Sequence, residues 1–217
     1  MPNYCYTTIT IIHKDERKLK DFYEKVGGWA KKTYSKNGFD CPEIGYYWLG
    51  NIVGNSGLAK WTKKENGTED FVPNISCRGT LQSLELRDNQ ISISTETAWC
   101  PMLEMWQLLC EKHLKGAEIY YVADQDGDGM YQTNDPDVIG KYNIDIVDTV
   151  PDEFEDFAES NYEATQEVVV ELLQRVLRTL ETDMDKLLRK LDVSDESEWL
   201  HIHPWKTVEL NEVIDCE

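Results

Sequence analysis

The sequence predicts a protein of the α+β class, and three observations lead to this prediction. Segments rich in β-branched residues occur along the first two thirds of the chain. Between them lie segments whose apolar residues recur every three or four positions, as on one face of a helix. A long amphipathic stretch follows near the C-terminus.

The first predicted elements are a strand over residues 4–12 and a helix over residues 15–26. The strand segment combines three threonines with three isoleucines, which favours extended backbone. In the helix segment, Leu19, Phe22 and Val26 fall on one face. The pair Gly27-Gly28 is predicted to stop this helix. Residues 29–75 show no clear period and are expected to form an insertion with short elements.

The next predicted unit is a β-hairpin with strands over residues 80–86 and 91–95, joined by a turn at residues 88–90. A helix follows from Pro101 to Gly116, and a strand over residues 118–122 closes the unit. The resulting order, β-α-β-β-α-β, is that of a ferredoxin-like core. We therefore expect a ferredoxin-like domain over residues 1–147, with the insertion after its first helix.

The C-terminal part is expected to extend this core. A fifth strand is predicted near residues 141–147, and a last strand over residues 200–210. Between them, apolar residues from Val169 to Leu191 step by three or four positions, which predicts one helix of about seven turns. We expect residues 148–217 to form an acidic, mainly helical extension packed on the sheet; the alternative is a coiled-coil dimer seam.

Charge is distributed unevenly along the chain. The net charge of −19 arises within residues 124–217, which contain 26 acidic and 7 basic side chains, whereas residues 1–123 contain 15 of each. Such a C-terminal half is not expected to bind a nucleic-acid backbone. It predicts a protein partner with a basic surface, for which acidic side chains imitate a row of phosphates. The alternative is a solvated surface that serves solubility.

Composition also indicates where in the cell the protein is expected. No run approaches the ~18 apolar residues of a membrane span, and no apolar signal region follows the N-terminus. We expect a cytoplasmic protein without a membrane partner. The six cysteines lack the paired spacing of a zinc site or a disulfide framework, so buried thiols are expected. The pattern leaves the oligomeric state open.

One segment has the ligand spacing of a calcium loop. Residues 124–135 place carboxylates at positions 1, 3, 5 and 12 around a glycine at position 6. Position 7 would contribute a backbone carbonyl, and position 9 would bind directly or through water. The predicted ligands are Asp124, Asp126, Asp128, Met130, Gln132 and Asp135. Calcium is favoured over magnesium.

Two features argue against a standard helix-loop-helix calcium site. Position 12 is Asp135, whose side chain is shorter than the glutamate that usually binds through both oxygens. The flanking residues 118–122 and 142–146 favour strands, so the loop should join strands. The alternative is a solvated acidic turn of a hairpin.

The sequence contains no recognisable catalytic motif. Gly50, Gly54 and Gly57 near Lys60 do not have the spacing of a phosphate-binding loop, and no hydrolase triad is indicated. His201 and His203 would share one face of a strand, but a third metal ligand is not visible nearby. An enzyme is therefore the least favoured interpretation, unless folding assembles a site from distant residues.

Several short segments resemble a known family, the ferredoxin-like proteins of the YubB type, which are uncharacterised proteins of phages, plasmids and other mobile elements. The opening residues 1–5 resemble the family's usual start, and residues 97–101, Thr-Ala-Trp-Cys-Pro, resemble its second landmark. Lys60-Trp61 and the hairpin ending at residues 133–135, Thr-Asn-Asp, are also similar. The resemblance covers residues 1–147. It implies the fold and a mobile-element origin, and it implies no activity.

Two functional hypotheses follow. The first is a non-enzymatic acidic binding protein that docks on a basic partner, such as a host defence or nucleic-acid-binding protein. The second is a structural protein that calcium stabilises through residues 124–135.

Overall fold

The computed structural model describes residues 3–34, 47–63, 69–125, 130–146, 150–151, 154 and 162–212. Over these residues the protein is a mixed α+β structure with five α-helices. None of the described helices combines the length and the apolar character that crossing a lipid bilayer requires. Residue contacts divide the chain into two compact units. The first comprises residues 1–130 with 208–217, and the second comprises residues 131–207.

The first unit is built on an antiparallel arrangement of four strands. These strands are β1 (Tyr4–Ile12), β4 (Gly79–Arg87), β5 (Gln90–Ala98) and β6 (Glu118–Gln125). Strand β1 lies between β5 and β6 and is antiparallel to both, and β4 pairs with the other edge of β5. The predicted hairpin is therefore confirmed as β4 and β5.

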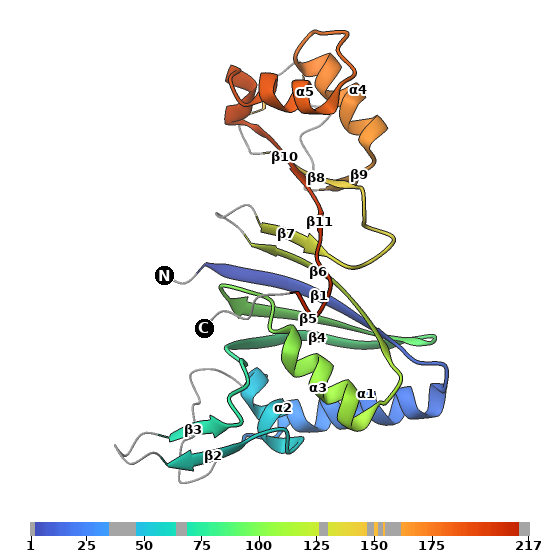
Figure 1. The fold of residues 1–217 in the computed structure, drawn as a ribbon, viewed down its shortest axis with the longest axis vertical. Helices are drawn as coiled ribbons and strands as arrows, with labels where there is room; N and C mark the ends of the chain where they lie inside the picture. The colour runs from blue at the N-terminus through green and yellow to red at the C-terminus, as the bar shows by residue number, and fades with distance from the viewer. Residues whose placement is uncertain are drawn as a thin grey trace. The chain divides into compact units, whose positions relative to one another are not determined.

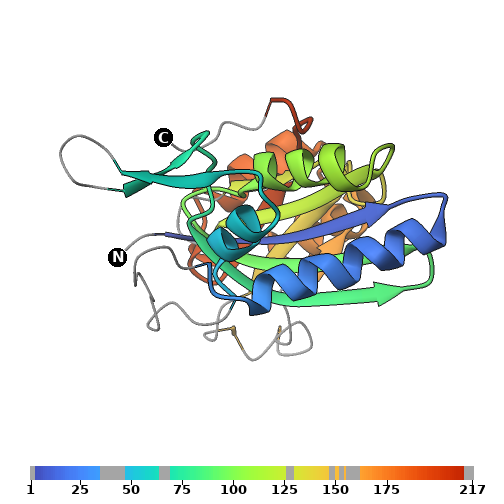
Figure 2. The same ribbon diagram turned by 90° about the horizontal axis from the view of Figure 1, so that it is seen from below.

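Two helices, α1 (Glu16–Lys31) and α3 (Leu103–His113), cover one face of these strands (Figures 1 and 2). Burial alternates along β1, as expected for a strand with one covered face. Ile9 and Ile11 on this covered face pack in one core with Phe22 of α1 and Trp106 of α3. The opposite face of β1 carries Tyr4 and Tyr6 and has no helix of this unit on it.

The first helix is longer than predicted, because Gly27-Gly28 does not end it. Helix α1 continues to Lys31. A glycine inside a helix costs roughly 1 kcal/mol relative to alanine, which packing at the helix end can offset. Here Val26 and Ala30 on either side of the glycines are both buried. The tertiary contacts therefore override the local stop signal.

The predicted insertion contains short elements, as expected. They are α2 (Leu49–Asn55) and the paired strands β2 (Lys60–Lys63) and β3 (Glu69–Val72). Helix α2 contributes Leu49, Ile52 and Val53 to the core of the first unit.

The second unit contains a separate three-stranded antiparallel sheet. Its order is β10 (Leu200–Pro204), β8 (Tyr142–Ile146), β9 (Tyr162–Ala164). One face packs against α4 (Gln166–Val176) and α5 (Met184–Leu191) in a core with Ile144, Val169 and Leu187. A short 3₁₀ helix, η3 (Asp195–Glu198), precedes β10. The predicted strand near residues 141–147 thus exists, but as the centre of this sheet, because both its edges find partners within the second unit.

The prediction of one seven-turn helix from Val169 to Leu191 was wrong. Helix α4 ends at Val176, and α5 begins at Met184. Arg178 between them has a positive φ of 49°, which a continuous α-helix does not allow. The side chain of Leu180, a member of the predicted apolar stripe, is 94% exposed. The break lets α4 and α5 bury separate apolar faces in one core.

Two further strands are β7 (Met130–Thr133) and β11 (Lys206–Thr207), which pair in parallel. The largest sheet is consequently mixed, with the hydrogen-bonded order β11-β7-β6-β1-β5-β4. The boundary of the two units within β7 differs from the sequence-based boundary after residue 147.

Candidate functional site

The predicted calcium ligands fall partly outside the described residues. Asp124 lies on β6, where it is the antiparallel partner of Tyr6. Asp126 and Asp128 belong to residues 126–129, which the structure does not describe. Met130 and Gln132 lie on β7.

Asp135, the last predicted ligand, has a local structural role. Its side-chain Oδ1 accepts a hydrogen bond of 2.9 Å from the backbone N–H of Asp137, and its own N–H donates to the Thr133 hydroxyl. These are the bonds of an Asx turn and of a serine/threonine turn. The flanking segments, β6 and β8, are strands, as predicted, but residues 124–135 also include the end of β6 and the strand β7. Within the described ranges, no three His, Cys, Asp or Glu side chains lie together in a geometry that would hold an ion. The calcium site stays a prediction.

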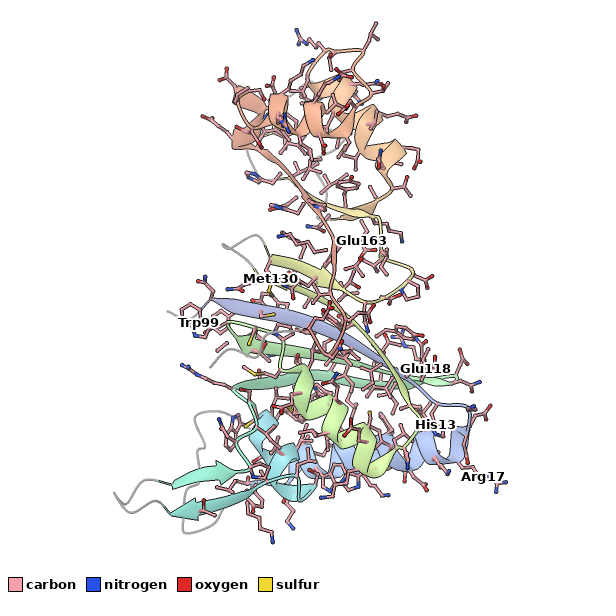
Figure 3. All side chains as sticks on the ribbon, viewed as in Figure 1. His13, Arg17, Trp99, Glu118, Met130 and Glu163 are labelled. Atoms are coloured by element: carbon pink, nitrogen blue, oxygen red, sulfur yellow. The ribbon has the colours of Figure 1, made fainter. Side chains whose placement is uncertain are left out.

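The two histidines of β10 lie on the polar face of the three-stranded sheet. Directly opposite residues of an antiparallel pair point to the same side. His201 is opposite Asp145, and His203 is opposite Asn143, which is in turn opposite Glu163 of β9. Glu163 is labelled in Figure 3. The same face therefore carries imidazoles, an amide and carboxylates, while the other face is apolar.

Two buried donors accompany this polar face. The side-chain amide Nδ2 of Asn143 and the indole Nε1 of Trp205 have no hydrogen-bond acceptor among the described residues. Desolvation lowers the pKa of His203, and the neighbouring His201 adds to this effect, while Asp145 opposes it. A neutral His203 can accept or donate one hydrogen bond. The cluster has the chemistry of a polar network, and among the described residues no third His, Cys, Asp or Glu side chain joins it in a geometry that would hold a metal ion.

Among the described residues of the second unit, most acidic side chains are exposed. Residues 131–207 contain 19 acidic and 7 basic side chains, a net charge of −12. On α4, Glu167 and Glu171 are exposed one turn apart. Hydrogen bonds from its own backbone N–H and from the Thr165 hydroxyl lower the pKa of Glu167, so its carboxylate is ionised at neutral pH.

Most basic side chains of this unit already have a partner. Lys186 lies 3.6 Å from a carboxylate oxygen of Glu181, and Lys141 lies 3.8 Å from one of Glu163. Lys190 donates to the Thr179 hydroxyl, and the guanidinium of Arg175 lies over the ring of Phe154. Exposed carboxylates on the described part of this unit, such as those of Glu167 and Glu171, are therefore available to an external cation.

A second surface was missed by the sequence analysis because it depends on strand register. Tyr6 of β1 lies opposite Glu96 of β5 on one side and Asp124 of β6 on the other. Its side chain is 40% exposed on the face that α1 and α3 do not cover. The sequence does indicate that alternate residues of the predicted strand 4–12 point to opposite faces. It does not indicate which residues of β5 and β6 lie opposite Tyr6.

Four cysteines are buried free thiols, as predicted: Cys5, Cys77, Cys100 and Cys110. Burial raises the pKa of Cys77 and of Cys110 to about 12. Because the thiolate is the reactive form, these two are not nucleophiles at neutral pH.

One cavity of the first unit, of about 510 Å³, lies between α1 and β4 and is lined by Glu24, Lys31 and Gln82 among others.

Comparison with protein-family models, with curated proteins and with solved structures gives no match. The resemblance of residues 1–147 to the YubB-type family therefore stays a prediction.

Proposed function

We propose that the protein is a non-enzymatic acidic binding module that docks on the basic surface of a protein partner. The observation that carries this proposal is the net charge of −12 on the compact unit of residues 131–207. A unit of this size needs far less charge for solubility, for which a magnitude of about 2–8 is sufficient.

The arrangement of charges supports docking by electrostatic attraction. Exposed carboxylates such as Glu167, Glu171 and Glu198 have no basic partner among the described side chains, whereas most of the basic residues are engaged. A basic protein cleft that binds phosphates responds to the density and spacing of negative charge. The proposed partner class is therefore a nucleic-acid-binding protein or a defence protein of a host, and the proposed setting is a phage or another mobile element.

The proposal includes a ferredoxin-like core for the first unit. The supporting observations are the order β1, α1, β4, β5, α3, β6 and the antiparallel strand order β6-β1-β5-β4. In this core α1 and α3 cover the same face of the sheet, and no described helix of the first unit covers the other face.

Fluorescence anisotropy of a labelled ten-residue oligolysine peptide tests the proposed docking. We expect binding at 50 mM salt that weakens by an order of magnitude or more at 500 mM, because counterions screen exposed charges. The double variant Glu167→Gln, Glu171→Gln should weaken binding at low salt several-fold. A peptide of ten glutamates should not bind.

The matched control is the double variant Asp21→Asn, Glu24→Gln, which removes two exposed charges from α1 in the first unit. It has the same net charge as the α4 variant and should bind the peptide more tightly than that variant. Equal losses in both variants would show that only net charge matters. Absence of any binding at low salt would overturn the proposed function.

A second candidate function is a structural protein that calcium stabilises. The observation that favours it is the complete carboxylate spacing of residues 124–135, a segment that begins at the end of β6 and includes β7.

A further inference from the structure

Strand β4 forms one edge of the largest sheet of the protein (Figure 1). Its inner side pairs with β5, and no strand of the described residues pairs with its outer side. The outer side has described partners at its start, where Trp48 forms a bridge with Thr80 and the Leu81 N–H donates to the Tyr47 carbonyl. Beyond the bulge that follows Leu81, β4 pairs regularly with β5 to its end. An open, regular edge of this kind can pair with a strand of another chain.

The strand pairing determines which backbone groups of β4 point outwards. In an antiparallel pair, opposite residues alternate between those that exchange hydrogen bonds and those whose N–H and C=O groups point away from each other. Arg87 and Gln90 flank the turn of the hairpin, so their backbone groups face each other. The next pair, Leu86 with Ile91, is therefore of the second kind. The N–H and C=O of Leu86 thus point to the outer edge.

Two side chains of opposite charge lie on one face of this open edge. Glu85 and Arg87 are two positions apart, so they share a face, and their exposed side chains form an ion pair of 2.5 Å. Leu84 and Leu86 point to the other face, where both pack against the core of the first unit. Charged residues usually prevent an edge from pairing with another chain. Here the two signs alternate, which makes the segment complementary to a second copy of itself.

We propose that the β4 edge pairs with the β4 edge of a second copy of this chain, with Leu86 opposite Leu86 at a two-fold axis. The two strands run antiparallel in this pair, so the same surface of each copy meets itself. Each Leu86 N–H donates to the Leu86 carbonyl of the other copy. Glu85 of each copy lies opposite Arg87 of the other, which gives two ion pairs across the axis.

The two neighbouring registers fit this edge less well. With Glu85 at the axis, the two Glu85 carboxylates lie directly opposite each other, and like charges in this position are unfavourable. With Leu84 at the axis, Arg87 of one copy lies opposite Leu81 of the other, whose N–H already has an acceptor in its own chain. The proposed register avoids both conflicts. Because the pairing of two short strand segments buries a small area, we expect a weak dimer that forms as the protein concentration rises.

Sedimentation-velocity ultracentrifugation of the full-length protein tests this pairing over a series from about 5 μM to about 500 μM, because small interfaces bind weakly. We expect the sedimentation coefficient to rise with concentration, as a monomer–dimer equilibrium requires. Glu85→Arg places two guanidinium groups opposite each other, and Arg87→Glu places two carboxylates there. Each variant should raise the dissociation constant of the dimer about tenfold or more, because each unfavourable pair occurs twice at a two-fold interface.

The double variant Glu85→Arg, Arg87→Glu restores opposite charges across the axis and should return the dissociation constant close to that of wild type. The matched controls are Glu111→Arg on α3 and Arg189→Glu on α5, which make the same charge changes at exposed positions outside β4. Both should leave the dissociation constant within about twofold, because salt screens charges that are distant from the interface. Net charge does not explain the expected pattern, since Glu85→Arg lowers the negative charge of the chain and Arg87→Glu raises it.

Hydrogen exchange gives a second measurement that needs no variant. The Leu86 amide points to the open edge, so it should exchange more slowly at high protein concentration than at low concentration. The Arg87 amide faces β5 and should be equally protected at both concentrations.

A protein that stays monomeric throughout the concentration series overturns the proposed pairing. So does a dimer that neither Glu85→Arg nor Arg87→Glu weakens, or a dimer that the folded double variant fails to restore. Thermal melts identify any variant that does not fold, and hydrogen exchange of wild type then decides: unchanged exchange of the Leu86 amide in a dimer places the interface elsewhere. None of these results bears on acidic docking, which concerns the second unit.

Discussion

The imidazole of His203 stacks on the phenol ring of Tyr131, with the ring centroids 4.4 Å apart and the planes 14° from parallel. Trp205 meets the same phenol edge-on, with centroids 5.3 Å apart. A strand of the second unit, β10, is thereby tied to the beginning of the unit at β7. Because His203 is partly buried among aromatic rings, protonation of its imidazole is unfavourable in the folded state.

This relationship predicts acid sensitivity of folding. The pKa of His203 is lowered below 6.5 by desolvation, so the unfolded chain binds more protons between the two pKa values. The free energy of unfolding should therefore fall as pH drops below about 6.5. His113 has a pKa lowered by burial and contributes with the same sign. Urea denaturation at pH 7.5 and 5.5 measures the loss, and His203→Gln should reduce it. An equal loss in wild type and His203→Gln would contradict the role of this side chain.

The break between α4 and α5 predicts opposite outcomes for two leucines of the same sequence stripe. Leu187 is fully buried, so Leu187→Ala should lower the free energy of unfolding by about 2–5 kcal/mol. Leu180 is 94% exposed, so Leu180→Ala should change it by less than about 0.5 kcal/mol. Chemical denaturation of both variants checks the difference. A large loss for Leu180→Ala would restore the single-helix interpretation.

The glycines of the first unit predict a stabilising substitution. A Cβ added at Gly28 in α1 would meet no heavy atom within 4 Å. Gly28→Ala should therefore raise the free energy of unfolding by about 0.4–1 kcal/mol, because alanine loses less backbone entropy on helix formation. Gly79→Ala is the contrasting variant, since its Cβ would lie 2.5 Å from the carbonyl oxygen of Glu96. Thermal melts should show shifts of opposite sign.

Calcium binding at residues 124–135 predicts a metal-dependent gain in stability. We expect the melting temperature of metal-stripped protein to rise by several degrees in millimolar calcium, with a smaller effect of magnesium. Asp124→Asn with Asp128→Asn should abolish the gain while the metal-free protein still folds. If calcium raises the melting temperature of this variant as much as that of wild type, the ligand assignment is wrong.

The sequence predicted the local elements of the first unit well, because their signals are local. β-branched density located β1, the turn at residues 88–89 located the β4–β5 hairpin, and helical spacing located α3. It misjudged the C-terminal helices, since apolar spacing continues through Leu180 although that side chain lies outside the core. The sequence-based prediction also placed the strand near residues 141–147 in the wrong sheet, because hydrophobic periodicity does not indicate which strands will pair.

The sequence by itself determined the types of most elements, the buried thiols and the concentration of negative charge after residue 123. Only the tertiary structure decided which side chains meet. The row of Glu96, Tyr6 and Asp124 joins residues about 90 and 118 positions apart in the chain, and strand register alone sets it. Register is set when all strands bury their apolar faces in the core together. It therefore cannot be predicted from any single segment of the sequence.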